Sequence, residues 1–147
     1  MRINTLKTTL NEFVIRLKAL SLDPVDDLTS LKDTTNGYLV DTNVGNLLAL
    51  HPSYPVTTTL AREYQSGTII LQDKASCIPA ALLDTEQGST VLDACAAPGN
   101  KTTQLAASVG QTGQLIAVEK DPKRAMTLKT MVAKAGASDC TFQYLTF

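Results

Sequence analysis

The chain of 147 residues has few cysteines and only one histidine, which excludes several classes of small protein. The three cysteines, Cys77, Cys95 and Cys140, are odd in number and widely spaced, and they form no Cys-x-x-Cys pair. This distribution argues against a disulfide framework and against a zinc ribbon. The histidine, His51, stands in a segment interrupted by prolines, where an incidental role is commoner than a catalytic one. We therefore expect no metal site and a reducing compartment.

Long apolar runs and an excess of one charge are also missing. No stretch approaches the length of a membrane span, about 18 apolar residues, and the beginning of the chain lacks the apolar core of a signal peptide. Thirteen Lys and Arg against fourteen Asp and Glu give a formal net charge of −1, so any contact with RNA or DNA must be local. With 44% hydrophobic residues, the chain is typical of a soluble, folded, intracellular protein without a membrane partner.

The first 66 residues are expected to form a small α/β unit. Thr9 and Glu12 have the spacing of a capping box, and the apolar positions after them predict an amphipathic helix from Thr9 to Leu20. The other elements expected here are a strand from Arg2 to Leu6, a loop from Asp23 to Asn36 and a strand from Gly37 to Asp41.

From Gly67 onward, strands and helices alternate with short polar connections. The expected strands are Thr68 to Gln72, Val91 to Cys95, Gln114 to Glu119 and Thr141 to Phe147; the expected helices are Lys74 to Leu83, Lys101 to Val109 and Pro122 to Ala135. Such alternation predicts an α/β fold with a parallel sheet and crossover helices.

The connection after the strand Val91 to Cys95 is a tight loop of small residues that leads directly into a helix. It has only one glycine, Gly99, which excludes both the Walker phosphate loop and the G-x-G-x-x-G dinucleotide fingerprint. Asp93 lies at the end of this strand, and Glu119 lies at the end of the next one. A carboxylate in the second position can accept hydrogen bonds from two ribose hydroxyls. The pattern therefore predicts a nucleoside cofactor without a pyrophosphate.

The stretch from Asp93 to Thr102, Asp-Ala-Cys-Ala-Ala-Pro-Gly-Asn-Lys-Thr, closely resembles the cofactor motif of the RsmB/NOP (Sun) family of S-adenosylmethionine-dependent RNA cytosine-5 methyltransferases. Three further stretches resemble the same family in the same order: Arg2 to Lys7, Gly67 to Ser76 and Val118 to Arg124. The form Ala-Cys-Ala-Ala-Pro-Gly-Asn-Lys-Thr is similar to the eukaryotic branch that modifies large-subunit rRNA.

The resemblance implies a fold, a cofactor and a partner. The fold is an incomplete Rossmann-like class I methyltransferase sheet over residues 67–147, preceded by an RNA-contacting unit over residues 1–66. The cofactor is S-adenosylmethionine, the partner is rRNA, and the location is the nucleus or nucleolus, with the cytoplasm left open. The residues assigned to the cofactor pocket are Cys95, Ala96, Ala97, Pro98, Gly99, Asn100 and Lys101, together with Glu119 for the ribose hydroxyls and Arg124 as a further contact.

The chain departs from the family pattern in two places. An Asp that approaches the adenine after the third strand aligns here with Thr146. The two catalytic cysteines of the family lie in a Pro-Cys block and a Thr-Cys-Ser block, and the printed sequence contains neither block. We therefore assign no catalytic residue, give Cys95 a packing or pocket-lining role, and expect the front part of a larger enzyme that is inactive and marginally stable alone.

Two other functions are open at this stage. The chain could be a catalytically inactive fragment that binds RNA or a partner, or a class I methyltransferase for another substrate. Four cations near the beginning, Arg2, Lys7, Arg16 and Lys18, form either a phosphate-facing patch or an ordinary solvated face, and the sequence favours neither.

Overall fold

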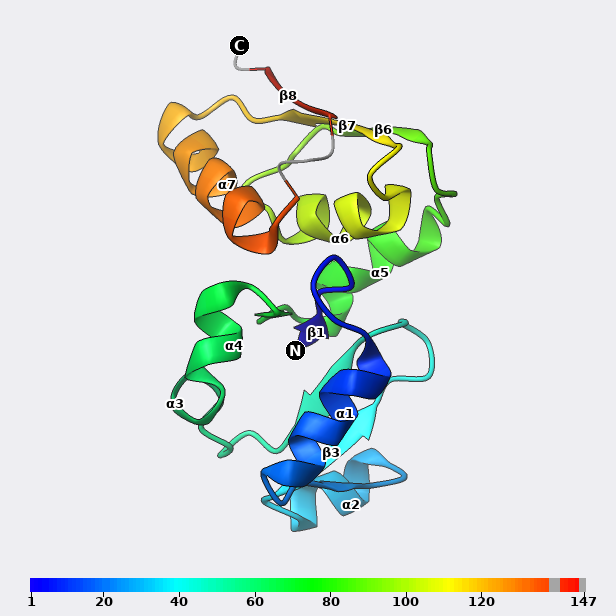
Figure 1. Ribbon diagram of the computed structural model, residues 1–147, viewed down its shortest axis with the longest axis vertical. Coiled ribbons are helices and arrows are strands. Elements are labelled where there is room, and N and C mark those ends of the chain that lie inside the picture. Colours follow the sequence, from blue (N-terminus) through cyan, green and yellow to red (C-terminus); the bar gives the residue numbers. More distant parts are fainter. Residues whose placement is uncertain (138–140, 146–147) are drawn as a thin grey trace. The chain divides into compact units, whose positions relative to one another are not determined.

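The computed structural model describes residues 1–137 and 141–145, and it divides the chain into two compact units, Met1–Leu71 and Gln72–Phe147 (Figure 1). We expected the second unit to begin at Gly67, but the boundary lies later. The strand β5 (Ile69–Ile70) pairs antiparallel with β1 (Arg2–Ile3), so it belongs to the first unit. Local β propensity predicted this strand, whereas its partner is set by contacts distant in sequence.

The first unit is a mixed α/β structure with short elements. Besides β1 and β5 it contains α1 (Leu10–Ala19), β2 (Asp23–Pro24), α2 (Leu28–Asp33), β3 (Gly37–Val40), β4 (Leu48–Leu50), α3 (Val56–Thr59) and α4 (Ala61–Ser66). Strand β3 pairs parallel with β2 and antiparallel with β4. The unit therefore contains a three-stranded sheet, β2–β3–β4, and a separate two-stranded sheet, β1–β5.

Helix α1 begins as the sequence predicts. The Glu12 backbone N–H donates to Thr9 Oγ1 at 3.2 Å, and the Thr9 backbone N–H donates to Glu12 Oε2 at 2.9 Å. This reciprocal capping box is confirmed. The hydrogen bond from the Thr9 backbone, which is made to the ionised carboxylate, holds the pKa of Glu12 below its usual value.

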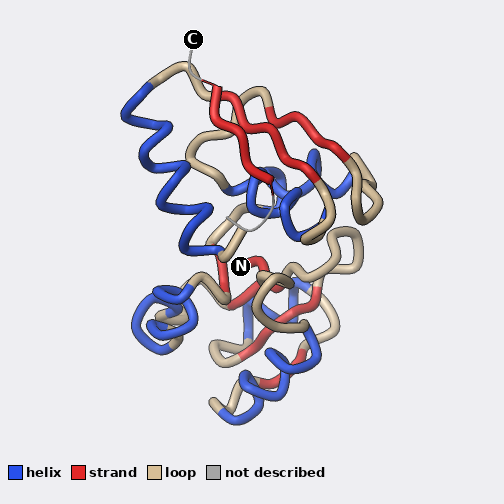
Figure 2. The backbone as a smooth tube through the Cα atoms, turned by 45° about the horizontal axis from the view of Figure 1, so that its top comes forward, coloured by secondary structure: helices blue, strands red, loops and turns tan. Residues whose placement is uncertain are grey.

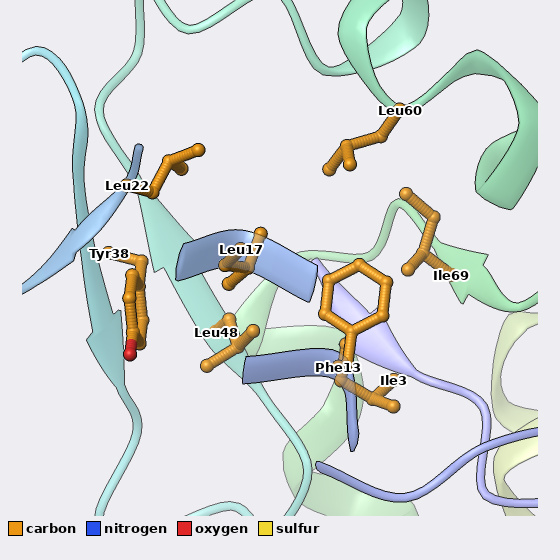
Figure 3. Packing of buried hydrophobic residues seen from close by; sticks show 8 residues of the cluster. All are labelled: Ile3, Phe13, Leu17, Leu22, Tyr38, Leu48, Leu60 and Ile69. Atoms are coloured by element: carbon orange, nitrogen blue, oxygen red, sulfur yellow. The ribbon is translucent and has the colours of Figure 1, made fainter. Parts of the chain in front are cut away.

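The apolar stripe of α1 forms the centre of a core in the first unit. Phe13 and Leu17 are buried there with residues from β1, β3, β4 and β5 and from the connections between them (Figure 3). The eight buried residues of this core are Ile3, Phe13, Leu17, Leu22, Tyr38, Leu48, Leu60 and Ile69. The apolar stripe of α1 therefore packs against strands of two separate sheets, β1–β5 and β2–β3–β4.

Two local predictions in this unit are wrong. The segment Asp23 to Asn36 is not a loop throughout, because it contains β2 and α2. Its polar residues serve as caps: Asp27 Oδ1 accepts from the Ser30 backbone N–H at 2.7 Å at the start of α2. The first strand ends at Ile3 rather than Leu6, since Asn4 Oδ1 accepts from the Leu6 backbone N–H and closes a turn.

The second unit is built on a parallel sheet in the order β6–β7–β8 (Figure 2). Strand β6 (Thr90–Asp93) pairs with β7 (Gln114–Val118), and β7 pairs with β8 (Thr141–Leu145), both in parallel. The predicted crossover topology is thereby confirmed. The parallel register places the ends of β6 and β7 at one edge, since Asp93 is opposite Ala117.

The helices of the second unit are α5 (Lys74–Leu82), α6 (Asn100–Val109) and α7 (Pro122–Ala135), and α6 and α7 lie on one face of the sheet (Figures 1 and 2). Burial alternates accordingly: Val91 is buried, whereas Leu92 is 60% exposed. Helix α7 has the predicted Pro122 in its first turn, and Gly136 adopts the left-handed conformation just after its end.

Candidate binding site at the ends of β6 and β7

The loop from Ala94 to Gly99 connects β6 to α6 and combines buried and exposed small residues. Ala96 and Ala97 are buried, whereas the side chains of Cys95 and Pro98 are exposed. The peptide between Ala97 and Pro98 is cis. The loop brings its backbone close to the sheet edge without bulky side chains in the way.

Gly99 ends the loop and starts α6 in a conformation that favours glycine. Its φ is +113°, a region that other residues rarely adopt. A Cβ at this position would lie 3.1 Å from Met131 Cβ and 3.2 Å from Leu128 Cδ1 of α7. Both the backbone angle and the close approach of α7 therefore require glycine here.

Two backbone N–H groups of the loop already have partners in the protein. The Cys95 N–H donates to Asp93 Oδ1 at 3.3 Å, and the Ala96 N–H donates to Val118 O at 3.1 Å. These two donors fix the loop to the ends of β6 and β7. A ligand at this edge would therefore meet the small side chains of Cys95 and its neighbours rather than these two N–H groups.

Glu119 follows β7 directly and is 5% exposed. One carboxylate oxygen, Oε1, accepts from the Asp121 backbone N–H at 3.1 Å, and the other, Oε2, lies 3.5 Å from Arg124 Nη1. Arg124 also donates through Nη2 to the Ala97 carbonyl at 2.8 Å. The guanidinium thus joins the loop after β6 to the carboxylate after β7.

Lys101 and Asn100 occupy the first turn of α6. The Lys101 side chain is exposed, and its Nζ donates to Ser76 Oγ of α5 at 3.2 Å. Its charge therefore lies on the α5 side of the helix start. Of the predicted residues, Ala97, Glu119 and Arg124 are thus in direct contact at one sheet edge, whereas the Lys101 ammonium lies beside Ser76 of α5.

The sequence reasoning missed one buried contact at this edge. Thr102 is fully buried on α6, and its Oγ1 lies 2.7 Å from Asp93 Oδ2 and 3.1 Å from the Ala96 carbonyl oxygen. The sequence pattern marks Asp93 only as an acidic residue at a strand end. A hydroxyl in the first turn of the helix that follows such an acid is the signal that could have identified the pair.

The remaining sequence candidates lie elsewhere. Cys77 is buried in α5, in agreement with a structural role, whereas Cys140 and Thr146 lie outside the described residues. His51 Nδ1 lies 2.6 Å from Ser53 Oγ and accepts from the Ser53 backbone N–H, so it serves a local turn.

Three of the four cations near the beginning are buried or bonded to another part of the first unit. Arg2 is only 2% exposed, and Arg16 Nε donates to Glu63 Oε1 at 2.9 Å. Lys7 Nζ donates to the backbone carbonyl at the end of α4, and Lys18 is exposed. These positions favour structural roles for Arg2 and Arg16 over a continuous phosphate-facing patch.

Within residues 1–137 and 141–145, no helix has the length and apolar character needed to cross a bilayer. In the same part of the chain, His, Cys, Asp and Glu side chains form no group of three or more that could hold a metal ion.

The sheet, its helices and the site at the strand ends define a Rossmann-like methyltransferase fold. A solved methyltransferase homologue from Pyrococcus horikoshii superposes on the chain with a TM-score of 0.70 at 25% identity, covering 99% of this chain and 42% of that one. The predicted fold class is therefore confirmed.

The sequence matches two family descriptions along most of its length. Residues 1–72 match the ferredoxin-like domain of NOL1/NOP2/Sun domain family member 5, and residues 80–143 match the 16S rRNA methyltransferase RsmB/F family. The 25S rRNA (cytosine-C(5))-methyltransferase rcm1 of Schizosaccharomyces pombe is 41% identical, covering 100% of this chain and 31% of the relative. A 28S rRNA (cytosine-C(5))-methyltransferase of Mus musculus is 40% identical, and the match covers 95% of this chain and 30% of that relative.

The chain belongs to the RsmB/F, NSUN5-like family of rRNA cytosine-C5 methyltransferases, as its motifs had indicated. This family depends on S-adenosylmethionine. The chain spans about a third of the length of the curated relatives, 31% and 30% of the two described above.

Proposed function

We propose that this chain binds S-adenosylmethionine at the ends of β6 and β7, as the cofactor-binding part of an enzyme that methylates C5 of cytosine in large-subunit rRNA. The pocket would be lined by residues 95–101, with Glu119 on the ribose and Arg124 beside it. An rRNA substrate of this kind supports a location in the nucleus or nucleolus. The names of the relatives from fission yeast and mouse support the substrate class.

The observation that carries the proposal is the burial of Glu119 together with the hydrogen-bond acceptor positions left on its carboxylate. The residue is 5% exposed, and among the described residues the Asp121 N–H contacts one carboxylate oxygen of Glu119 and Arg124 contacts the other. A carboxylate has about four acceptor positions, so about two remain for the vicinal hydroxyls of a ribose. The neighbouring loop carries small side chains, Cys95, Ala96 and Ala97 among them, which suit the close approach of the adjoining part of a nucleoside, so these residues fit the cofactor.

The chemistry of the reaction explains what else is needed. S-adenosylmethionine supplies an electrophilic methyl group, whereas C5 of cytosine is a poor nucleophile. The family resemblance implies that a cysteine thiolate adds at C6 to activate C5, and that a base and a second cysteine assist release. The target base must be unpaired or flipped out of its helix. The residues of this chain would bind and orient the cofactor.

Calorimetric titration of the chain with S-adenosylmethionine tests the cofactor site. Glu119→Ala removes the acceptors for both ribose hydroxyls and is expected to weaken binding by at least about tenfold, because hydrogen bonds to charged groups are worth about 1.5–3 kcal/mol each. Glu86→Gln, at an exposed glutamate of the same unit, should leave affinity unchanged. Wild-type protein without cofactor binding, or equal affinity in Glu119→Ala, would contradict the proposal.

A second titration, with fragments of large-subunit rRNA, separates this proposal from a binding module. Cofactor binding that depends on Glu119 supports the proposal that the chain is the cofactor-binding part of an enzyme. RNA binding in a chain that takes up no cofactor would instead support a non-catalytic module that acts through its first unit.

A further inference from the structure

We infer that Thr102 is a positioning residue that, through Asp93, holds the loop after β6 in the conformation that receives the cofactor. The inference rests on the proposed cofactor site and adds a residue behind it. Thr102 does not line the exposed side of the loop, because its side chain is fully buried.

Asp93 uses its two carboxylate oxygens on two different segments. Oδ1 accepts from the Cys95 backbone N–H at 3.3 Å, at the beginning of the loop, and Oδ2 accepts from Thr102 Oγ1 at 2.7 Å, in α6. Asp93 is itself 9% exposed and stands at the end of β6. One buried carboxylate therefore ties the strand, the loop and the helix together.

The Thr102 hydroxyl has one proton and two nearby acceptors. The contact with the carboxylate is shorter than the 3.1 Å contact with the Ala96 carbonyl, and charged acceptors form the stronger bonds. The proton is therefore donated mainly to Asp93, and the Ala96 carbonyl shares it. In this way Thr102 contacts both the residue that holds Cys95 and the loop backbone itself.

Neighbouring contacts explain why loss of this hydroxyl would affect the loop before it affects the rest of the unit. Two further contacts hold the loop: the Ala96 N–H donates to the Val118 carbonyl, and Arg124 donates to the Ala97 carbonyl. Neither of them restrains Cys95 directly. Without Thr102 Oγ1, the buried Asp93 carboxylate loses one of its two described donors, and its orientation toward Cys95 is no longer fixed.

The chain offers a matched control on the same helix. Thr103 is also buried, but its hydroxyl donates at 3.0 Å to the Asn100 carbonyl within α6. Thr103→Val and Thr102→Val thus remove the same atom type from adjacent buried positions, and only Thr102→Val removes a contact with Asp93. Thr102→Ser retains the hydroxyl and tests rescue.

The first measurement is amide hydrogen exchange without cofactor, followed by two-dimensional NMR. Thr102→Val should accelerate exchange at Cys95 and Ala96 about tenfold relative to wild type, while β7 amides keep their rates. Thr102→Ser should restore slow exchange, and Thr103→Val should leave the loop unchanged. Unchanged Cys95 exchange in Thr102→Val would overturn the inference even if the protein bound no cofactor at all.

The second measurement is calorimetric affinity for S-adenosylmethionine. Thr102→Val is expected to bind about tenfold more weakly, Thr102→Ser within about threefold of wild type and Thr103→Val within about twofold. Equal losses in the two valine variants would indicate a general effect on α6 and would contradict a positioning role. If Thr102→Val does not fold, Asp93→Asn, which turns one acceptor into a donor, should produce the same loop exchange and the same loss of affinity.

Absence of binding by the wild-type protein would count against the proposed function alone. Wild-type binding that persists unchanged in folded Thr102→Val would count against the positioning role alone.

Discussion

At the scale of single residues, Arg124 connects two parts of the candidate site that are far apart in sequence. It donates to the Ala97 carbonyl and lies beside the Glu119 carboxylate. Because its side chain is 52% exposed, the ion pair with Glu119 alone is worth little. The planar guanidinium contributes chiefly by reaching both groups at once, which a single ammonium cannot do.

Replacement of Arg124 by methionine is therefore expected to weaken S-adenosylmethionine binding by about tenfold, because the loop carbonyl and Glu119 both lose a donor. Arg124→Lys should give an intermediate affinity, since it keeps the charge but not the two-point contact. Calorimetry measures both, with Lys123→Met, at the neighbouring exposed cation, as the control. An Arg124→Lys variant that binds like wild type would show that charge alone is sufficient.

At the scale of elements, the start of α6 depends on the backbone of Gly99. Three glycines allow the contributions to be separated: Gly99 has a positive φ and close neighbours, Gly88 has a positive φ and no neighbour closer than 3.6 Å, and Gly45 has neither. Alanine at Gly99 should lower the free energy of unfolding by about 2–3 kcal/mol, at Gly88 by about 1 kcal/mol, and at Gly45 by less than about 0.5 kcal/mol.

Urea unfolding followed by circular dichroism measures this series. The order of the three losses is the test, because it separates backbone strain from crowding against Met131 and Leu128 of α7. If Gly99→Ala lowers the free energy of unfolding no more than Gly88→Ala does, the close packing of α7 against Gly99 does not add to the requirement for glycine at this position.

The elements also differ in how far the sequence predicts them. Helices α1, α6 and α7 were predicted within one or two residues, because capping residues and Gly110 or Gly136 are local signals. The partner of β5 and the Asp93–Thr102 contact were not predicted, because both depend on residues that the chain brings together only on folding. The strand ends and Glu119 were correctly placed at one edge, since parallel pairing follows from the alternation of strands and helices.

At the scale of the whole molecule, the two units carry different parts of the proposed activity. The first unit has its own core around α1 and matches a ferredoxin-like domain, and the second contains the site at the ends of β6 and β7. The formal net charge of −1 gives neither cofactor nor RNA a strong general attraction. Binding should therefore depend on the local groups described here, and on Glu119 above all.

The chain of 147 residues should take up S-adenosylmethionine without transferring its methyl group. The Pro-Cys and Thr-Cys-Ser blocks that hold the catalytic cysteines of the family are absent from the printed sequence. Of the two cysteines whose surroundings are described, Cys77 is buried and Cys95 is an exposed thiol on the proposed cofactor loop, and neither belongs to a Pro-Cys or a Thr-Cys-Ser block.

Incubation of large-subunit rRNA fragments with the chain and labelled S-adenosylmethionine, followed by nucleoside analysis, should therefore yield no labelled 5-methylcytosine above a protein-free control. Calorimetry on the same preparation should still detect the cofactor, which separates an inactive chain from an unfolded one. Labelled 5-methylcytosine would contradict this prediction. Cys95→Ser would then decide whether the exposed thiol of the loop is the nucleophile: loss of label in a Cys95→Ser variant that still binds the cofactor by calorimetry, but not in Cys77→Ser, would assign the addition at C6 to Cys95.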